Sequence, residues 1–266
     1  MFMQYAPGND HKAIGDAPAI VQEFFVLTLY TIYILYNVMI PAKKEDCRAE
    51  LIERILTLEI APGTMLDEAA LSEEFGLSRT PLREVYQSLA GDGYLTLLRN
   101  RGAKVSSMDI ESMRSFFQSA PMIYSAIGRL AIENANTHQV EDLKETQRRF
   151  RQSCEEGETR EMAIHNHRFH EIVGEMAASV YLEPSLRRLL IDHTRMSQKF
   201  YKPVNSKERL LVWDACDQHD AMIIAIEEGD ADTMVRLTLE HWELSRNRIE
   251  KFSRPDPLEF DLEQAG

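Results

Sequence analysis

The sequence is poor in cysteine. Only three of its 266 residues are cysteines, and no two of them have a CxxC spacing. An odd number of thiols without that spacing argues against a disulfide framework and favours reduced thiols in the cytoplasm. Positive charge is also scarce, with 30 Lys and Arg against 43 Asp and Glu and a formal net charge of -13. This balance excludes a chain that wraps nucleic acid with its whole surface.

The few positive charges are concentrated in one stretch. Residues 78–107 contain five basic and two acidic side chains, a net charge of +3. A local patch of this kind acts within a screening length of about 8–10 Å, whatever the charge of the rest of the surface. The length of the chain allows one or two domains with a sizeable core. A basic surface on one small part of an acidic protein is therefore expected.

Charge is missing altogether from residues 24–42, "FFVLTLYTIYILYNVMIPA". Nineteen such residues could just cross a bilayer, and Lys43 and Lys44 would place the following chain in the cytoplasm. The stretch could also pack as an extra helix. A third interpretation, which we favour, is that Met39 is the natural start and that residues 1–38 come from an upstream start codon. A membrane anchor is then not expected.

The residues that follow predict three short helices. Asp46 can cap the first, Asp67 can cap a second that ends at Phe75, and Gly76 can close it in the left-handed conformation. Ser78 can cap the third, which tolerates a proline in its first turn. In this third helix the apolar positions follow a helical period, and polar residues occupy the opposite face. That polar face consists of Arg79, Thr80, Arg83 and Gln87.

Two short strands are predicted next, "YLTLL" and "AKVS", joined by a turn "RNRG" in which Gly102 can adopt positive φ. Helix, turn, helix and hairpin make a winged helix-turn-helix. Arginine near the start of the third helix suits the two major-groove acceptors of guanine. Arg99 and Arg101 at the tip of the hairpin can reach phosphates or the minor groove, and Lys104 can reach a phosphate. Double-stranded DNA is the predicted partner.

The stretch "APGTMLDEAALSEEFGLSRTPLREVYQSLAGDGYLTLLRNRGAKV" resembles the DNA-binding domain of GntR-type bacterial transcription regulators, above all in "SRTPLRE", "GYL" and "NRGAKV". The resemblance implies a DNA-binding domain over residues 45–107, after an N-terminal extension of residues 1–44. One position departs from the pattern. Where members often carry an Arg near the start of the second helix, this chain has Ala69, so its operator preference is expected to differ.

No strand alternation follows Ser106, and the rest of the chain predicts an all-α bundle over residues 108–253 with a tail at 254–266. The fold class is therefore mainly α. The helical patterns cover roughly 109–134, 140–156, 159–177, 183–200, 206–228 and 231–252.

Histidines fall on the apolar stripes of three of these helices. His170 projects close to Asn166 at the edge of one stripe, whereas His167 is predicted to point toward solvent. His219 and His241 each lie on a core stripe of their own helix. Neutral imidazoles that converge from three helices form a natural site for Zn²⁺ or a similar cation.

"NHRFHEIV", "DQHDAMIIAIEEGDAD" and "LEHW" are similar to the FCD ligand-binding domain of the FadR-type branch of GntR regulators. The resemblance implies a divalent metal, such as Zn, Ni or Mn, held by Asn166, His170, His219 and His241 at the floor of an effector cavity. Many members have Asp at the first of these positions. The neutral amide of Asn166 is therefore expected to weaken metal binding.

A second departure concerns the effector. Members that bind small carboxylic acids usually have Arg and Glu in the first helix of this domain, where the chain has Ala120 and Tyr124. Loss of the guanidinium removes a bidentate carboxylate clamp, so a less anionic effector that engages Tyr124 is expected. Pro121 should kink or break the same helix.

The sequence thus predicts a cytoplasmic, ligand-responsive repressor that binds a palindromic operator as a homodimer, because one helix reads only a half-site. Two alternatives remain: a membrane-tethered form of the same regulator, and a metal-dependent enzyme that uses the histidine cluster. No HExxH motif or comparable general base accompanies the histidines, so the protein is not expected to be an enzyme.

Overall fold

A computed structural model describes residues 19–34, 38–99 and 101–253. The predictions for residues 1–18 and for the tail at 254–266 lie outside the described part of the chain. The described residues fall into two compact units: those up to residue 49 together with residues 67–85 form one, and residues 50–66 together with those from 86 onward form the other.

The first helices of the described chain are α2 (Ala19–Ile34) and α3 (Ile40–Leu56). Within the described residues, no helix combines the length and the apolar character needed to cross a membrane. The prediction that Asp46 caps the first helix of the DNA-binding domain is wrong, because α3 begins at Ile40 and already contains Asp46. The helix starts upstream because Pro41 is tolerated in a first turn and the residues that follow it, Ala42 and two lysines, favour a helix.

Helix α4 (Glu68–Phe75) begins and ends where its capping residues predict. The Asp67 carboxylate accepts hydrogen bonds from the backbone N–H groups of Ala69 and Ala70, and Gly76 adopts φ 58°. Helix α5 (Arg79–Gly91) follows directly. Lys44 on α3 forms an ion pair with Glu84 on α5, with 2.6 Å between Nζ and Oε2.

A two-stranded antiparallel hairpin completes the winged helix-turn-helix. Strands β1 (Leu95–Leu98) and β2 (Gly102–Val105) pair with Leu95 opposite Val105. Gly102 has φ 77°, the conformation that its place in the turn requires. Met65 adds an isolated bridge to Lys104 on the other side of β2. The predicted helices and hairpin are therefore present.

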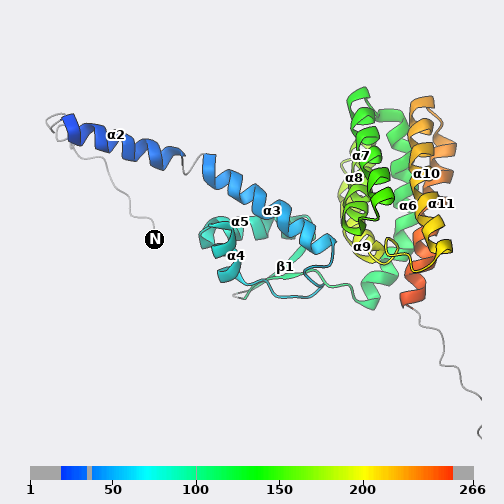
Figure 1. Ribbon diagram of the computed structural model, residues 1–266, viewed down its shortest axis with the longest axis horizontal. Coiled ribbons are helices and arrows are strands. Elements are labelled where there is room, and N and C mark those ends of the chain that lie inside the picture. The colour runs from blue at the N-terminus through cyan, green and yellow to red at the C-terminus, as the bar shows by residue number, and fades with distance from the viewer. Residues whose placement is uncertain (1–18, 35–37, 100, 254–266) are drawn as a thin grey trace, which may run out of the picture. The chain divides into compact units, whose positions relative to one another are not determined.

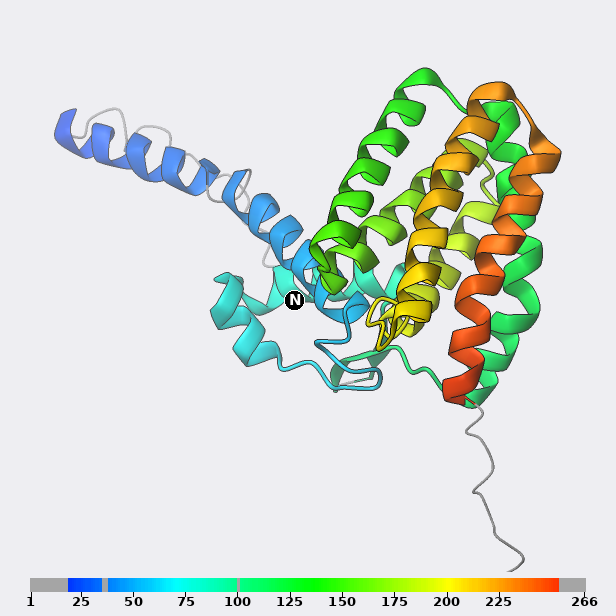
Figure 2. The ribbon, with the colours of Figure 1, turned by 45° about the vertical axis from the view of Figure 1, so that its right-hand side comes forward.

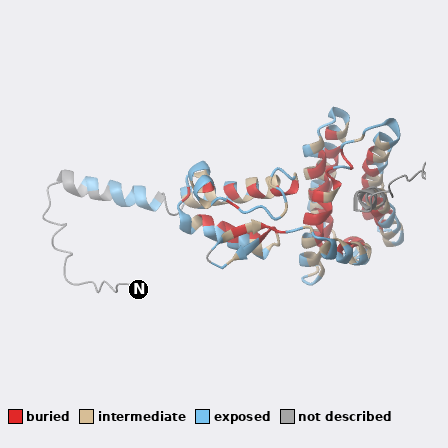
Figure 3. Cartoon of the chain, turned by 90° about the horizontal axis from the view of Figure 1, so that it is seen from below, coloured by how far each residue is buried: buried red, intermediate tan, exposed pale blue. Residues whose placement is uncertain are grey.

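Six helices form the all-α bundle, coloured from green to red-orange in Figures 1 and 2. Neighbouring pairs include α7 with α8, α6 with α11, α8 with α9 and α10 with α11. Figure 3 shows that their buried positions face inward and their outer edges are exposed. The helices are α6 (Ile110–Asn134), α7 (Thr137–Glu156), α8 (Thr159–Ala177), α9 (Leu182–Ser197), α10 (Ser206–Glu228) and α11 (Ala231–Ser253).

Pro121 does not break the bundle's first helix. Helix α6 is continuous from Ile110 to Asn134 and contains this proline. Proline removes one backbone hydrogen bond from a helix interior. The turns on both sides are held by burial of Phe116, Ala120 and Tyr124 against the other helices. Tertiary packing therefore maintains a helix that the local sequence would interrupt.

Candidate functional site

Helix α5 separates its buried and polar faces as predicted. Leu82, Val85 and Leu89 are buried, with at most 2% of their surface exposed. The opposite side chains are available for contact with another molecule. The exposed side chains on that side are Arg79, Thr80, Arg83 and Gln87.

Arg83 lies in a weak ion pair. Its Nη2 is 3.4 Å from Oε2 of Glu68, and its side chain is 62% exposed. A long, exposed pair of this kind contributes little to stability, so a phosphate or a guanine edge can replace the carboxylate.

The hairpin also presents positive charge. Arg99 and Arg101 are exposed, and Lys104 is half-buried. The backbone N–H of Arg101 donates to the carbonyl oxygen of Leu98 at 3.1 Å, which keeps the turn tight. Asn100, at the tip, lies outside the described residues. The described basic side chains suit contacts to nucleic-acid phosphates.

In the bundle, the three predicted histidines converge. His170 on α8, His219 on α10 and His241 on α11 each offer a ring nitrogen, and these nitrogens lie within 4.8 Å of one another. All three side chains are buried. The His219 ring stacks on Phe169, with 3.8 Å between ring centroids and 8° between planes. The stacking fixes the plane of one imidazole in the cluster.

Glutamines orient two of the rings. Nδ1 of His219 lies 3.1 Å from Oε1 of Gln147, and Nδ1 of His241 lies 3.1 Å from Oε1 of Gln218. The Gln147 amide is itself oriented, because its Nε2 donates to the carbonyl oxygen of Cys216 at 2.8 Å. An acceptor beside Nδ1 places the ring proton there and leaves Nε2 with a free lone pair.

The imidazoles are held neutral. Burial lowers the pKa of His241 to about 4. Burial, followed by the nearby charge of His241, lowers the pKa values of His170 and His219 well below their usual value. Desolvation disfavours the charged form of each ring. At neutral pH the cluster therefore offers lone pairs rather than positive charge.

These donors fit a divalent cation. Within the described chain, Nε2 of His170, Nε2 of His219 and Oδ1 of Asn166 are buried without a hydrogen-bond partner. A buried polar atom without a partner in the protein can be satisfied by a water molecule or an ion. Three imidazoles and one amide oxygen suit Zn²⁺ or a similar ion. His170, His219, His241 and Asn166 would hold it.

Tyr124 lies beside this cluster and contacts a histidine that the sequence did not single out. Its hydroxyl oxygen is 2.8 Å from Nδ1 of His193 on α9. Burial raises the pKa of Tyr124 above its usual value, so the hydroxyl stays protonated and can donate this bond. The Trp242 ring lies 5.8 Å from Tyr124 and 5.5 Å from His193, measured between centroids. The wall at Tyr124 is therefore aromatic.

Little space is left at the histidines. The adjoining cavity has a volume of about 10 Å³, enough for roughly one water molecule. An organic effector at this place would have to move side chains. The residues that line the cavity are Asn166, His193, Ser197, Phe200, Tyr201, Ala215, His241 and Leu244.

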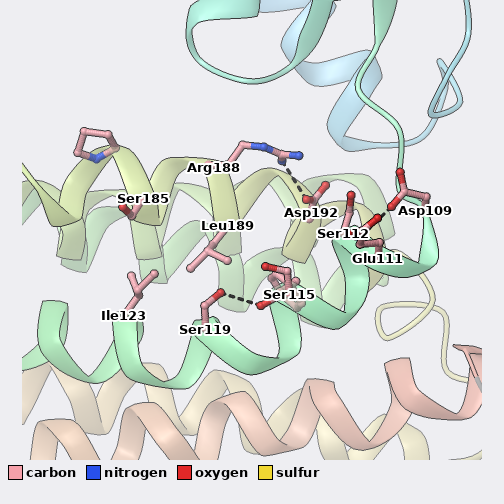
Figure 4. Close-up of a pocket in the computed structure, with 12 residues that line it drawn as sticks. Asp109, Glu111, Ser112, Ser115, Ser119, Ile123, Ser185, Arg188, Leu189 and Asp192 are labelled. Atoms are coloured by element: carbon pink, nitrogen blue, oxygen red, sulfur yellow. Dashed lines mark hydrogen bonds and ion pairs between the residues drawn. The ribbon is translucent and has the colours of Figure 1, made fainter.

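A much larger groove of about 740 Å³ runs between α6 and α9 (Figure 4). One side carries Ser112, Ser115 and Ser119 from α6. The other carries Arg188, whose Nη1 donates to Oδ2 of Asp192 at 2.9 Å. The groove is lined by polar and apolar side chains, and the group of potential metal ligands found among the described residues lies elsewhere, at the histidines.

Helix α9 also contacts backbone outside the bundle. Arg195 is fully buried, forms an ion pair with Asp192, and donates from Nη1 to the carbonyl oxygen of Ser106 at 2.8 Å. Nε2 of Gln198, the residue that directly follows α9, donates to the carbonyl oxygen of Leu56 at 3.0 Å. Both contacts lie within the unit formed by residues 50–66 and 86–266. The helix that carries His193 thus also holds the chain just after the hairpin.

The prediction that His167 points to solvent is wrong. His167 is buried, and its Nδ1 lies 2.8 Å from Oγ1 of Thr194. Helix α9 covers α8 on this side and gives it a second buried face. His193 was missed, although it follows Leu189 and Leu190 at helical spacing and so lies on a core stripe. His165, also on α8, is half-buried, with Nε2 3.6 Å from a Glu161 oxygen.

Two family profiles match the chain. The profile described as "Bacterial regulatory proteins, gntR family" matches residues 43–105. The FCD domain profile matches residues 121–244. The first match contains α5 and the hairpin, and the second contains all four predicted metal ligands and Tyr124.

Similar proteins include the HTH-type transcriptional repressor RspR of Escherichia coli K12, 26% identical over 68% of this chain and 78% of that protein. The gluconate operon transcriptional repressor of Bacillus licheniformis is 25% identical over 76% of this chain and 82% of its own. Among solved structures, E. coli McbR/YncC superposes with a TM-score of 0.66 at 16% identity, covering 80% of this chain and 99% of that one. The last likeness concerns the fold alone.

Proposed function

The chain belongs to the GntR family of bacterial transcription regulators and carries a C-terminal FCD domain, and from this premise we propose that it is a metal-binding repressor that reads a palindromic operator as a homodimer. Its similar proteins are named as regulators rather than enzymes. We expect it to act in the cytoplasm. The observation that carries the proposal is the exposed polar face of α5 within the matched DNA-binding domain.

Recognition is proposed to use two sets of contacts. Arg79 and Arg83 on α5 would pair with guanine edges in the major groove, with Thr80 and Gln87 beside them. Arg99, Arg101 and Lys104 of the hairpin, with the turn held by Gly102, would contact phosphates or the minor groove. The short α5 reads only a few base pairs, so a twofold dimer on a symmetric site supplies the remaining specificity.

Ligand control is proposed to lie in the bundle. A divalent cation such as Zn²⁺, Ni²⁺ or Mn²⁺ would supply Lewis-acid chemistry at the floor of the site. Asn166, His170, His219 and His241 position the donors, and the glutamine contacts fix two ring tautomers. Asn166 contributes no negative charge, which lowers the affinity that a carboxylate would give. Repression is supported by the names of the similar regulators.

The effector is proposed to be less anionic than a simple dicarboxylate. Ala120 is fully buried and has no cationic head, and the neighbouring Tyr124 offers a hydroxyl and an aromatic face. A site without a guanidinium cannot form the bidentate pair that carboxylates favour. Titration calorimetry with small carboxylic acids tests this, and tight binding of an ordinary dicarboxylate would contradict it.

Selection of bound DNA from a random pool, with and without a chelator, tests sequence-specific DNA binding. A palindromic sequence should be enriched. The Arg83→Ala variant should bind that sequence about 1–3 kcal/mol more weakly if Arg83 pairs with a guanine. Arg236→Ala is a matched control, because Arg236 is an exposed arginine on α11 of the bundle.

No enriched palindrome under either condition would refute the proposed operator reading. Equal losses in the Arg83 and Arg236 variants would refute the assignment of the α5 face and leave only nonspecific electrostatic binding. Chelator dependence of the selected sequence separately tests whether the bundle's cation influences DNA binding.

A further inference from the structure

Two opposite sides of α9 face different parts of the chain. Successive residues of a helix are rotated by about 100°, so His193 and Ser197 project to one side. Both residues line the small cavity beside the histidines. Asp192, Arg195 and Gln198 project to the opposite side, where Arg195 and Gln198 donate to backbone carbonyl oxygens after the hairpin and at the end of α3. One short stretch of helix therefore connects the cavity with the base of the hairpin.

The base of the hairpin is held together at Ser106, which directly follows β2. Its backbone N–H donates to the carbonyl oxygen of Tyr94 at 2.9 Å, and its Oγ donates to that of Gly93 at 2.8 Å. Its own carbonyl oxygen accepts the hydrogen bond from Arg195. A β-carbon at Gly93 would lie only 2.6 Å from Cδ of Arg188, so α9 also packs closely against the first strand. Because these residues belong to one compact unit, a displacement of α9 acts on both strands.

Arg195 supplies a contact that a purely packing residue could not make. Its Nη1 binds the Ser106 carbonyl oxygen and its Nη2 binds the Asp192 carboxylate. Its Nε is buried and has no hydrogen-bond partner within the described chain. Burial lowers the pKa of Arg195, and the Asp192 carboxylate opposes this effect. A buried ion pair is often no more stabilising than apolar side chains of the same size, so the forked contact points to a role in position rather than in stability.

The cavity side of α9 leaves no room for an occupant larger than a water molecule. The cavity has a volume of about 10 Å³. The Ser197 hydroxyl beside it is buried without a hydrogen-bond partner among the described residues. The His193 ring is held by the Tyr124 hydroxyl on α6. Since a close-packed interior cannot take up extra volume without moving its walls, an occupant has to displace helices that line the cavity, and α9 is one of them.

We propose that Arg195 is a positioning residue for the hairpin, and that α9 makes the position of the hairpin depend on what occupies the cavity beside His193 and Ser197. This inference rests on the proposed binding of an effector in the bundle. An occupant that displaces α9 away from the cavity presses its opposite side against Ser106 and Gly93, because the two sides of the helix are opposed.

The consequence for DNA binding follows from the basic side chains of the hairpin. When the base of the hairpin shifts, Arg99, Arg101 and Lys104 shift with it and lose their alignment with the DNA backbone. The occupant of the cavity and the DNA then affect each other's affinity, although neither touches the other's binding residues.

The role of Arg195 is tested with the full chain in a chelator and with operator DNA obtained from the selection described above. Arg195→Met is combined with Asp192→Asn, so that no buried carboxylate loses its partner. The slope of log affinity against log salt should be smaller by at least about 0.9, because the hairpin loses at least one phosphate contact. Arg187→Met is the matched control on the same helix, because Arg187 is exposed and pairs with Glu183; it should keep the parent slope.

A double-mutant cycle separates positioning from a general loss of structure. Lys104→Ala should reduce affinity less in the paired Asp192 and Arg195 variant than in the parent, whereas Arg83→Ala should reduce it equally in both. A parent-like slope in the paired variant, or full additivity with Lys104→Ala, would refute the positioning role. A parent chain that enriches no operator would instead refute the proposed function, and the exchange experiment below does not depend on that function.

Hydrogen exchange in a chelator tests the connection to the cavity without DNA. Ser197→Leu fills the cavity, and the peptide of residues 93–107 should then exchange about fivefold faster, as the loss of one hydrogen bond predicts. Ser153→Leu enlarges a buried serine on α7 instead and should leave this peptide unchanged. In the paired variant, Ser197→Leu should have no effect on the peptide, because the contact with Ser106 is already lost.

The smaller Ser197→Val takes the place of Ser197→Leu if the leucine variant does not fold. Unchanged exchange of residues 93–107 in a folded Ser197 variant would refute the connection through α9. Equal acceleration in the Ser197 and Ser153 variants would refute it as well, because the hairpin would then respond to any loss of stability in the bundle.

Discussion

The buried histidines should make the metal-free bundle sensitive to mild acid. Burial lowers the pKa of His193 to about 3 and that of His241 to about 4, against an ordinary value of 6.5. In the unfolded chain both rings bind a proton between pH 6.5 and pH 4, whereas in the folded chain they do not. The unfolded state then binds more protons, so the free energy of unfolding falls as the pH is lowered.

The magnitude follows from these values. pH 5 lies about 1.5 units below the ordinary pKa of a histidine ring in the unfolded chain. Each unit changes the free energy of unfolding by about 1.4 kcal/mol. Between pH 7.5 and pH 5, each histidine therefore lowers the free energy of unfolding by about 2 kcal/mol, and the two together lower it by about 4 kcal/mol. This is a large part of the 5–15 kcal/mol that stabilises an ordinary domain.

Urea unfolding in a chelator measures the effect directly. The chain has two tryptophans, Trp213 on α10 and Trp242 on α11, so its tryptophan fluorescence reports on the bundle. The pH dependence should be compared between the parent chain and His193→Gln, which keeps a hydrogen-bond acceptor for Tyr124. Between pH 7.5 and pH 5, the free energy of unfolding of the variant should fall by about 2 kcal/mol less than that of the parent.

His138→Gln is the matched control, because His138 on α7 has an exposed side chain. Its pH dependence should equal that of the parent. Carboxylates that titrate in this range are common to all three chains and cancel in the comparison. The same decrease in His193→Gln as in the parent would show that His193 is not held neutral by burial, and would refute the reasoning.

Two further predictions concern the proposed ligands. Lys104→Ala should lower the slope of log affinity for operator DNA against log salt by about 0.9, because one phosphate contact is lost; titrations between 50 and 200 mM salt measure it, and an unchanged slope would exclude that contact. Gln147→Ala should weaken zinc affinity about 10–100-fold, because His219 loses the acceptor that fixes its tautomer. Competition with a colorimetric chelator measures this, with Gln152→Ala as the exposed control on the same helix. Equal affinities in the two glutamine variants would contradict it.

Much of the fold was predictable because its signals are local. Asp67 and Gly76 delimit α4 through hydrogen bonds within a few residues of each other, and the structure reproduces both ends. The convergence of His170, His219 and His241 was predictable as well, because each lies on an apolar stripe and such stripes face a common core.

The remaining features depend on contacts distant in sequence. Pro121 would end an isolated helix, yet α6 continues because its buried side chains pack against other helices. The helical period predicts that His167 points toward solvent, but α9 covers its side chain, and Thr194 on α9 is its hydrogen-bond partner. No local pattern in the sequence indicates which second helix will cover a given helix face. The burial of α8 on two sides, and with it the burial of His167, could therefore not be predicted.

The contacts of α9 bear on how this protein could be re-engineered. His193, Arg195 and Gln198 lie within six consecutive residues of the chain, which a helix places along less than about 10 Å of its axis. A substitution here meant to admit a new inducer would also disturb the backbone at Ser106 and Leu56. Libraries for a biosensor with altered specificity are better built on α6, around Ala120 and Tyr124, where the described side chains make no hydrogen bond to those two segments.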